Sequence, residues 1–370
     1  MRGAFLGTLL AAAVLLVGSP PAGAATCAKT VHTVAAAQAA VGKARAGTAV
    51  CLADGTYGPI SLRANTSRPG VTLRARRPGR AVVGGVELAG SNLTVAQLRL
   101  TGTVTIAPGA VGMRVDHTTL LGGGRGSGYG VMVCPAEPPE HCDDTSITHN
   151  RFVGRFDEDA IRANVYHDGP DTDHDGLLVE DNEFTGNVEY GGHNDVFQSV
   201  WVGDHLVFRG NYLHDFGGQG FFVKDQDSPI DGLVVEDNLI VRQNRPCDPP
   251  SLCPGFQLSP FQIFGPINHA VIRHNTVWPG RRGGLAVLRG SGWSDATVSD
   301  NVFRALARDA SVQLSAANNT RCGASAGMDA IPGTGRDCSP HFANPKAGDY
   351  RERGGRGVRW RLSQKHFGPG

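Results

Sequence analysis

The chain repeats one short pattern six times: ITHNRF (147–152), VEDNEF (179–184), FRGNYL (208–213), VEDNLI (235–240), IRHNTV (272–277) and VSDNVF (298–303). Each copy places an asparagine three residues after one apolar side chain and two residues before another. These asparagines are Asn150, Asn182, Asn211, Asn238, Asn275 and Asn301. Their intervals run from 26 to 37 residues. A unit of this length that recurs along a chain indicates a repeat architecture.

Each repeat contains a short run of β-forming residues, a polar corner and a second short run, as in GLLVEDNEF (176–184) followed by NDVFQSV (194–200). Val, Ile and Phe dominate these runs, and none of them has helical periodicity. One coil cannot bury its apolar side chains alone, whereas stacked coils about 4.8 Å apart share a core. Leucine-rich repeats have shorter units, and propeller blades need four strands where two or three fit. We therefore predict an all-β parallel β-helix of about nine or ten coils.

The six asparagines belong to the structure of the coils in this interpretation. Asparagine tolerates the left-handed backbone conformation of a sharp corner. Its side-chain amide can also bond to the asparagine of the next coil, as in an amide ladder.

Residues 1–24 have the layout of a secretory signal peptide. Arg2 supplies the charged region, Ala4 to Val17 the apolar core, and residues 22–24 (AGA) the small-residue cleavage site. The apolar core is short for a membrane span, and no other segment approaches one. We expect a secreted, soluble protein.

The eight cysteines fall as neighbours in the chain: Cys27/Cys51, Cys134/Cys142, Cys247/Cys253 and Cys322/Cys338. An even count in an exported chain indicates disulfides. We expect this sequential pairing, and other pairings remain open. The formal net charge of +1 gives no overall field for a polyanion, so we expect no nucleic-acid partner. The expected assembly is a monomer.

The segment 32–46 (HTVAAAQAAVGKARA) is alanine-rich and reads as the best helix of the chain, and a strand, TAVCLADGTY (48–57), follows it. The open end of a solenoid needs a cap. This helix and strand resemble the N-terminal cap of pectate-lyase-like β-helix proteins, a group that includes alginate lyases and chondroitinase B. The resemblance implies a single-stranded right-handed parallel β-helix. The expected segments are a signal peptide (1–24), a cap (25–60), the β-helix (61–345) and a basic, Gly-rich tail predicted to be disordered (346–370).

Alignment of the second runs predicts which side chains face outward. One apolar column faces the core: Ala160, Val196, Phe221, Phe261 and Leu285. The adjacent outward column contains Asp159, Asp195, Gly220, Pro260 and Gly284, and further outward positions are Ile161, Phe197, Phe222 and Gln262, then Ala163, Ser199 and Lys224. Asp159 thus lies one strand spacing from Asp195. Two carboxylates this close do not both ionise freely, so one keeps a proton or a cation lies between them.

An acidic cluster surrounds this pair, because Asp157 and Glu158 precede it and the insertion 167–176 adds four more aspartates. Such an oxygen-rich, sulfur-free set suits calcium. We expect a Ca²⁺ cofactor with these ligands: Asp157, Glu158, Asp159 and Asp195. The run D-x-D-x-D-G at 171–176 matches the opening of an EF-hand loop. However, Asn182 occupies its twelfth position and no helices flank it, so we reject a true EF-hand.

Polar residues of two adjacent coils supply the candidate catalytic residues, namely Asp195, Lys224 and His193. The candidate substrate-binding residues are Gln198, Arg162, Asp225, Phe197, Phe222, Gln262 and Arg289. Structural alternatives stay open for several of them. Lys224 can equally form a surface ion pair, His193 can be an ordinary loop histidine, and single aromatic residues more often belong to a core.

Three functions fit these residues. A polysaccharide lyase that cleaves a uronate-containing glycan by β-elimination needs a base and a group that neutralises the uronate carboxyl. A glycoside hydrolase needs two carboxylates, for which Asp159 with Asp195 or Asp195 with Asp225 would serve. A non-catalytic glycan-binding or structural solenoid needs neither a base nor a pair of catalytic carboxylates. The fold-level resemblance favours the lyase, although the pectate lyase signature RxPxxR and the polygalacturonase signatures are absent.

Overall fold

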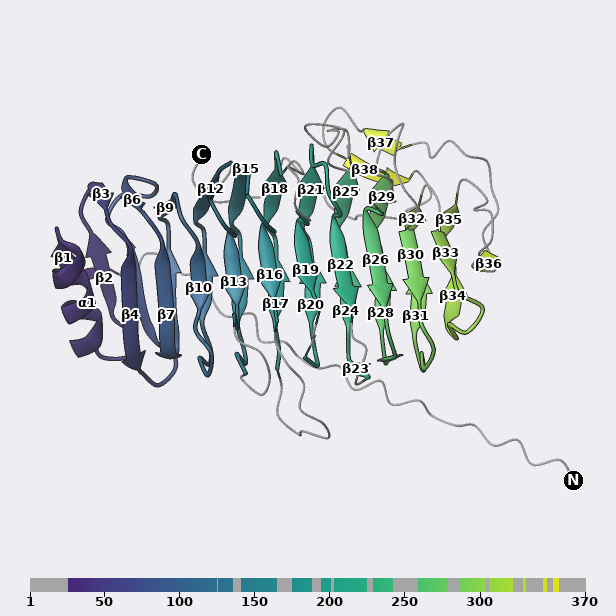
Figure 1. Ribbon diagram of the computed structural model, residues 1–370, viewed down its shortest axis with the longest axis horizontal. Helices are drawn as coiled ribbons and strands as arrows, with labels where there is room; N and C mark the ends of the chain where they lie inside the picture. The colour runs from purple at the N-terminus through teal and green to yellow at the C-terminus, as the bar shows by residue number, and fades with distance from the viewer. Residues whose placement is uncertain are drawn as a thin grey trace, which may run out of the picture.

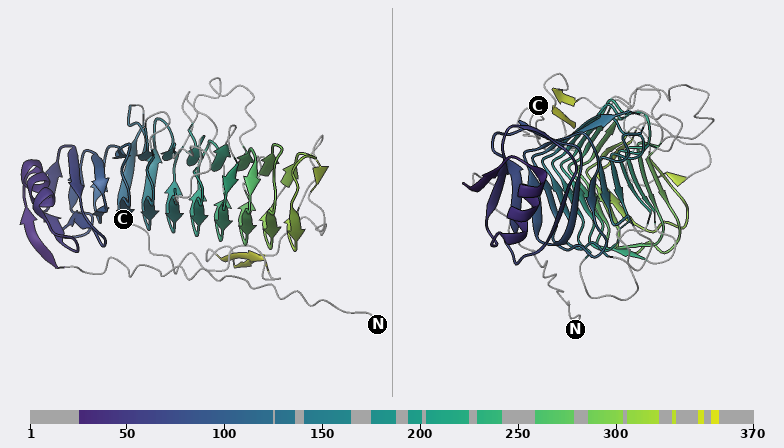
Figure 2. Two further views of the ribbon diagram at one scale, coloured as in Figure 1. Left: turned by 90° about the horizontal axis from the view of Figure 1, so that it is seen from below. Right: turned by 60° about the vertical axis from the view of Figure 1, so that its left-hand side comes forward.

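A solenoid of stacked coils dominates the computed structural model, which describes residues 26–124, 126–135, 141–164, 175–187, 194–200, 203–224, 229–241, 259–278, 286–303, 306–321, 329–330, 342–344 and 349–352. Three long sheets run along its axis, which lies horizontally in Figure 1. Seen obliquely from its N-terminal end, the coils lie behind one another around a common interior (Figure 2). The predicted single-stranded right-handed parallel β-helix is confirmed.

Each complete coil contributes one strand to each long sheet, in the order A, B and C. Sheet A contains β1 (Cys27–Val31), β2 (Ala49–Leu52), β5 (Val71–Ala75), β8 (Leu93–Ala96), β11 (Arg114–Asp116), β14 (Ser146–Thr148), β17 (Leu178–Glu180), β20 (Val207–Arg209), β24 (Val234–Glu236), β28 (Val271–Arg273), β31 (Thr297–Ser299) and β34 (Ser315–Ala317). Sheet B contains β3 (Gly55–Tyr57), β6 (Ala81–Val83), β9 (Arg99–Leu100), β12 (Thr119–Gly123), β15 (Arg151–Arg155), β18 (Glu183–Thr185), β21 (Tyr212–His214), β25 (Leu239–Val241), β29 (Thr276–Trp278), β32 (Val302–Phe303) and β35 (Thr320–Arg321). Sheet C contains β4 (Ile60–Asn65), β7 (Val86–Ser91), β10 (Val104–Ile106), β13 (Val131–Val133), β16 (Ile161–Ala163), β19 (Phe197–Ser199), β22 (Phe221–Lys224), β26 (Phe261–Phe264), β30 (Ala286–Arg289), β33 (Leu306–Arg308) and β36 (Asp329–Ala330).

Two short sheets accompany the solenoid. β23 (Ile230–Asp231) pairs in parallel with β27 (Ile267–Asn268). β37 (Phe342–Asn344) pairs in an antiparallel manner with β38 (Asp349–Glu352), which lies within the segment 346–370. β36 also runs antiparallel to β33 at the end of sheet C.

The amide ladder is present at the corner between sheets A and B. From Asn150 to Asn301, each side-chain amide donates through Nδ2 to Oδ1 of the next asparagine over 2.9 to 3.1 Å. The same Oδ1 accepts from the backbone N–H of the asparagine before it, and all six side chains are fully buried. The ladder continues to Asn319, which the sequence pattern did not reveal because SAANNT (315–320) lacks the large apolar residues of the other copies.

The left-handed residue at this corner is the one before each ladder asparagine, which corrects the expected backbone role of the asparagine itself. Positive φ values occur at His149 (55°), Asp181 (54°) and Asp237 (55°), among others. The asparagine therefore contributes its side-chain amide to this corner and not a left-handed backbone conformation. The residue before it makes the turn, where Asp, His and Gly tolerate a positive φ.

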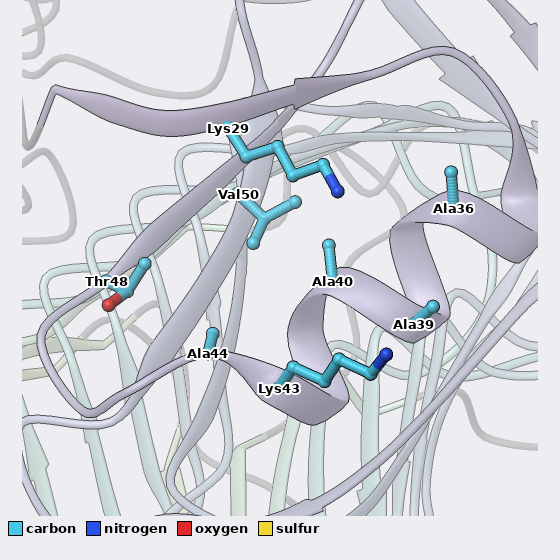
Figure 3. A pocket seen from close by; sticks show the side chains of 8 residues that line it. All are labelled: Lys29, Ala36, Ala39, Ala40, Lys43, Ala44, Thr48 and Val50. Atoms are coloured by element: carbon cyan, nitrogen blue, oxygen red, sulfur yellow. The ribbon is translucent and has the colours of Figure 1, made fainter.

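The N-terminal cap follows the prediction closely. Helix α1 (Val34–Lys43) begins after Thr33, whose Oγ1 accepts from the backbone N–H of Ala36 at 3.2 Å. Ala37 and Val41 of α1 are buried against the first coils, and the helix closes the left end of the solenoid in Figure 1. A pocket of about 320 Å³ lies between α1 and β1 and β2 (Figure 3). Its lining residues are Lys29, Ala36, Ala39, Ala40, Lys43, Ala44, Thr48 and Val50.

Two of the four expected disulfides are formed, Cys27–Cys51 and Cys134–Cys142. The other two expected pairs, Cys247/Cys253 and Cys322/Cys338, lie outside the described residues, as does the expected signal peptide 1–24. In the described part of the chain, α1 is too short to span a bilayer and no longer apolar helix is present.

Candidate functional site

The outward face of sheet C contains six of the thirteen predicted site residues: Arg162, Gln198, Phe222, Lys224, Gln262 and Arg289. Strands β13, β16, β19, β22, β26 and β30 follow one another along the axis (Figure 1). Their parallel register places one outward column in the order Met132, Arg162, Gln198, Phe222, Gln262 and Val287. The next outward column contains Lys224, Phe264 and Arg289 on β22, β26 and β30.

The predicted register is correct for Asp159 over Asp195 and shifts by one residue at β22. Phe197 aligns with Phe221, not with Phe222. Phe197 is therefore a core residue, fully buried and stacked on Phe221 with ring centroids 5.3 Å apart, which corrects its predicted contact with substrate. Ile161, also expected outside, is buried in the same way.

The cause of this shift is the bend between sheets B and C, where two consecutive residues are buried. Ala160 and Ile161 are both inaccessible, as are Val196 and Phe197. Alternation of inward and outward side chains, which the alignment assumed, holds only within the strand. At the same bend, a Cβ atom on Gly220 would lie 2.4 Å from the carbonyl oxygen of Pro260, so only glycine fits there.

Asp159 and Asp195 are stacked on adjacent coils as predicted, but they are buried and not displayed on the surface. Their exposed fractions are 2% and 1%. The backbone N–H of Asp195 donates to Asp159 Oδ1 at 2.8 Å, and the backbone N–H of Gln219 donates to Asp195 Oδ1 at 3.2 Å. Each carboxylate thus binds the backbone of the following coil.

Burial raises the pKa of the Asp159 carboxyl to about 7. The hydrogen bond from Asp195 and the charge of Arg162 act in the opposite direction, and Glu158 adds to the rise. The Arg162 guanidinium lies 3.5 Å from Asp159 Oδ2, and it also donates to Gln198 Oε1 and to Asn164 Oδ1. Three neighbours therefore fix the direction of the Arg162 side chain on the outward face.

The amides of Gln219 and Gln262 extend this network along the axis. With its nitrogen turned toward the carboxylate, the Gln219 amide donates to Asp195 Oδ2 at 2.9 Å and accepts from Gln262 Nε2 at 2.6 Å. Gln198 and Gln262 are mostly buried, with exposed fractions of 6% and 7%. The polar groups of the coils from β16 to β26 thus form one connected layer under the outward surface.

Cations and aromatic rings occupy the outer part of the same face. Arg289 lies over the ring of Phe264, with its guanidinium carbon 5.5 Å from the ring centroid, and its Nε is 4.0 Å from Asp309 Oδ1. Phe222 packs edge-on against Phe264 at 5.7 Å. Lys224 is half-buried, and no carboxylate among the described residues lies within ion-pair distance of it.

The four residues predicted to bind calcium do not fit a metal ion. Asp157 Oδ2 accepts from the backbone N–H of Gly126 at 2.8 Å, and Glu158 is exposed. The carboxylates of Asp159 and Asp195 already accept backbone N–H groups, and Arg162 is beside Asp159. Calcium takes six to eight oxygen ligands around one point, and no three of these four carboxylates are among the described groups whose ligand atoms lie within 4.8 Å of one another.

Two predicted site residues, His193 and Asp225, lie outside the described residues. Three residues that the sequence did not single out lie in the site, Tyr129, Gln219 and Phe264. Burial raises the pKa of Tyr129, and the charges of Glu158 and Asp159 add to this rise, which places the phenol near the acidic end of the face. A register one residue different between β19 and β22 would have revealed Gln219 beside Asp195.

No family model and no curated protein matches the chain. Among solved structures, PfbA, a surface adhesin of Streptococcus pneumoniae, superposes with a TM-score of 0.50 at 12% identity, over 78% of this chain and 84% of that one. This likeness is one of fold, the parallel β-helix. The PL6 family alginate lyase AlyGC gives a TM-score of 0.41 at 14% identity, over 80% of this chain, which spans about half (51%) of that protein. The alginate lyase AlyF-OU02, solved with G6, gives 0.46 at 14% identity, over 93% and 95% of the two chains.

Proposed function

We propose that the protein is a polysaccharide lyase that binds a uronate-containing glycan along the outward face of sheet C. One observation carries this proposal. The described residues of β16, β19, β22, β26 and β30 include three cations and no carboxylate. The cations are Arg162, Lys224 and Arg289, and they lie on alternate coils.

The spacing of these cations suits a repeating anion. Adjacent strands of a sheet are about 4.8 Å apart, so alternate coils place one cation roughly every 10 Å along the axis. A glycan with carboxylates at regular intervals would meet these charges when it lies along the solenoid. Phe222 and Phe264 between the cations provide apolar surface for the faces of sugar rings.

The burial of Asp159 and Asp195 weighs against the glycoside hydrolase. That reaction needs two carboxyl groups that reach opposite sides of a glycosidic bond, about 5 Å or roughly 6.5–9.5 Å apart. Both carboxyls accept backbone N–H groups and are almost inaccessible. In our proposal they position the outward residues, Asp159 by orienting Arg162 and Asp195 by orienting Gln219.

Lys224 is the proposed base. Its ammonium group first gives a proton to water, and the resulting amine takes the proton on the carbon next to the uronate carboxyl. The electron pair forms a carbon–carbon double bond as the bond to the glycosidic oxygen breaks, and that oxygen then takes a proton from water. The amide of Gln262 on the adjacent strand and the flanking cations bind the carboxylates of the bound chain.

The test is incubation of the protein with alginate, pectate, a uronate-containing glycosaminoglycan and a neutral glucan, with added Ca²⁺ and with a chelator. We expect an unsaturated, ultraviolet-absorbing product from one acidic polysaccharide. Reducing ends without that absorbance would instead indicate a hydrolase. Binding without any product would indicate the non-catalytic solenoid.

Substitution of Lys224 by Ala then tests the site. We expect turnover to fall by about 100-fold or more, as for loss of a general base, with an unchanged melting temperature because Lys224 has no ion pair among the described residues. Lys29→Ala, in the cap pocket, is the matched control and keeps full activity. Full activity of Lys224→Ala would contradict the assignment of the base.

A further inference from the structure

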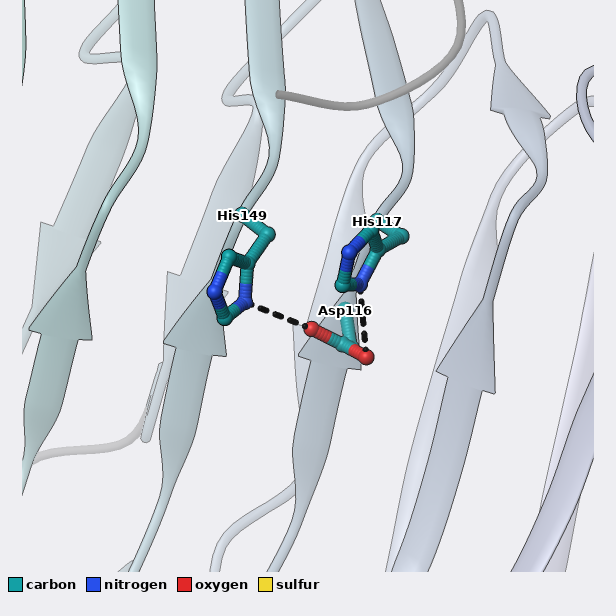
Figure 4. Close-up of side chains that lie close together, drawn as sticks. All are labelled: Asp116, His117 and His149. Atoms are coloured by element: carbon teal, nitrogen blue, oxygen red, sulfur yellow. Dashed lines mark hydrogen bonds and ion pairs between the residues drawn. The ribbon is translucent and has the colours of Figure 1, made fainter. Parts of the chain in front are cut away.

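A second cluster of chemically reactive side chains lies away from sheet C, at the corner between sheets A and B. Asp116 is the last residue of β11, and His117 follows it. β14 lies on the next coil in register, Asp116 beside Thr148, so His149 follows at the equivalent corner. Figure 4 shows the two imidazoles on neighbouring coils, both directed at the same carboxylate.

The three side chains converge closely. His117 Nδ1 lies 2.9 Å from Asp116 Oδ2, and His149 Nδ1 lies 3.2 Å from Asp116 Oδ1. The two rings are stacked, with centroids 4.6 Å apart and planes 14° from parallel. Thr148 Oγ1 donates to Asp116 Oδ1 at 2.8 Å and so fixes the carboxylate, which is 4% exposed. About a third of each histidine side chain is exposed, 32% for His117 and 35% for His149.

This geometry matches a metal centre. One ligand atom from each residue lies within 4.8 Å of the other two. A tetrahedral zinc ion has ligands at roughly 2.0–2.2 Å, which places neighbouring ligand atoms a little over 3 Å apart. His117 Nδ1 is 2.9 Å from Oδ2 of Asp116 and His149 Nδ1 is 3.2 Å from Oδ1, so each nitrogen is close to that edge length from one of the two carboxylate oxygens.

The surroundings also suit a metal-binding histidine. A histidine that binds a metal through Nδ1 carries its proton on Nε2, where a carboxylate commonly accepts it. Asp181 Oδ2 of the following coil lies 3.8 Å from His149 Nε2, which is within ion-pair distance but longer than a hydrogen bond. The exposed side of the cluster leaves room for water as a further ligand.

We propose that Asp116, His117 and His149 bind a divalent transition metal ion of the zinc type, with Nδ1 of each histidine and the carboxylate of Asp116 as ligands. The ligand set of two imidazoles and a carboxylate favours zinc over calcium or magnesium, which prefer oxygen ligands. The ion links two consecutive coils across the β11–β14 pair. This site is separate from the face of sheet C, and it does not depend on the proposed lyase activity.

The test is a titration of the untagged, metal-free protein with Co²⁺, whose visible absorption reports coordination, followed by competition with Zn²⁺. We expect one Co²⁺ per chain, displaced by Zn²⁺, and a higher melting temperature with Zn²⁺. His117→Asn and His149→Asn are expected to weaken binding by at least about tenfold. Asparagine suits these positions because it tolerates their positive φ values of 46° and 55°.

The matched control is His269→Asn. His269 also has a positive φ (52°) and also contacts a carboxylate, with Nδ1 at 2.5 Å from Asp231 Oδ1, but it lacks a stacked second histidine. We expect the His269→Asn variant to bind Co²⁺ with the same affinity as the wild type. Anomalous diffraction from zinc-soaked crystals of the wild type locates the ion without any substitution. Absence of Co²⁺ binding, equal binding by all variants, or a zinc peak elsewhere would overturn the proposal.

Discussion

Each ladder asparagine is satisfied in all of its hydrogen-bonding groups by neighbours on the adjoining coils. The Asn211 amide donates to Val179 O at 2.9 Å and to Asn238 Oδ1 at 3.1 Å. Its oxygen accepts from the backbone N–H and the side-chain amide of Asn182. An amide can do this because it has both a donor and an acceptor, so a column of identical amides satisfies itself from Asn150 to Asn301.

Substitution of Asn211 by Ala should therefore strongly destabilise the protein. It leaves the backbone N–H of Asn182 buried without its partner, at about 1–3 kcal/mol, and removes one hydrogen bond from the carbonyl of Val179 and one from Oδ1 of Asn238. We expect the free energy of unfolding to fall by about 3 kcal/mol or more. Asn268→Ala removes one exposed hydrogen bond to Ser294 and should cost about 1 kcal/mol or less. Equal losses in denaturant titrations of the two variants would contradict the role of the ladder.

Asp159 gives the protein a pH-dependent stability with a definite sign. The unfolded carboxyl loses its proton near the ordinary pKa of 3.8, whereas the folded carboxyl keeps it up to a pKa of about 7. Between these values the native state binds more protons than the unfolded state, so the free energy of unfolding falls as the pH rises. The free energy of unfolding stops falling once the pH exceeds the pKa of Asp159 in the folded state, because the buried carboxyl is then fully charged.

Asp159→Asn should remove this dependence. Asparagine retains an oxygen for the N–H of Asp195 and carries no charge. We expect the loss of melting temperature between about pH 5 and about pH 8 to be smaller in the variant than in the wild type. The hydrogen bond to Asp231 raises the pKa of His269, so this residue also lowers the free energy of unfolding as the pH rises. Its contribution is the same in both proteins and therefore cancels in the comparison. A wild type and variant with identical pH profiles would contradict the raised pKa of Asp159.

At the scale of the strand, two adjacent phenylalanines of β22 face opposite sides of the sheet. Phe221 faces the core, where its ring lies 5.3 Å from Phe197, 5.3 Å from Phe261 and 4.7 Å from Phe208. Phe222 faces outward on the candidate binding face. Two identical side chains on one strand thus provide an internal comparison between packing and binding.

Phe221→Ala should lower the free energy of unfolding by about 3–5 kcal/mol, because it leaves a cavity among stacked rings. Phe222→Ala should cost about 1 kcal/mol or less in stability and should instead weaken the affinity for the glycan. Chemical denaturation and glycan binding, measured on both variants, separate the two effects. A larger loss of stability in Phe222→Ala than in Phe221→Ala would show that the register of β22 is wrong.

The accuracy of sequence-based prediction differs between elements for a physical reason. The A–B corner was predicted well because each coil repeats one geometry there, with a buried amide and a left-handed residue before it. The B–C bend was predicted poorly, since it buries two consecutive residues and interrupts alternation. The run QGFFVK (219–224) permits two registers, and only packing against Phe197 and Phe261 selects one.

At the scale of the whole molecule, the sequence located the candidate face on the strands after each asparagine corner, and the structure brings Arg162, Gln198 and Gln262 together there. It did not foresee that Asp159 and Asp195 are buried, because burial depends on the loops and coils that cover them. It also did not foresee the cluster of Asp116, His117 and His149. His149 alone reads as a corner residue, and its partners come from the preceding coil.

The ladder also has a consequence for how such a chain can change its length. Each coil from Asn150 to Asn301 presents the same amide to its successor, although these coils differ in size, with 29 residues between Asn182 and Asn211 and 37 between Asn238 and Asn275. If one complete coil were duplicated or lost, the two coils on either side of the change would still present matching asparagines to each other, and their other contacts would be preserved. Such changes would lengthen or shorten the outward face of sheet C by whole coils, and so would change the length of glycan that this face can bind.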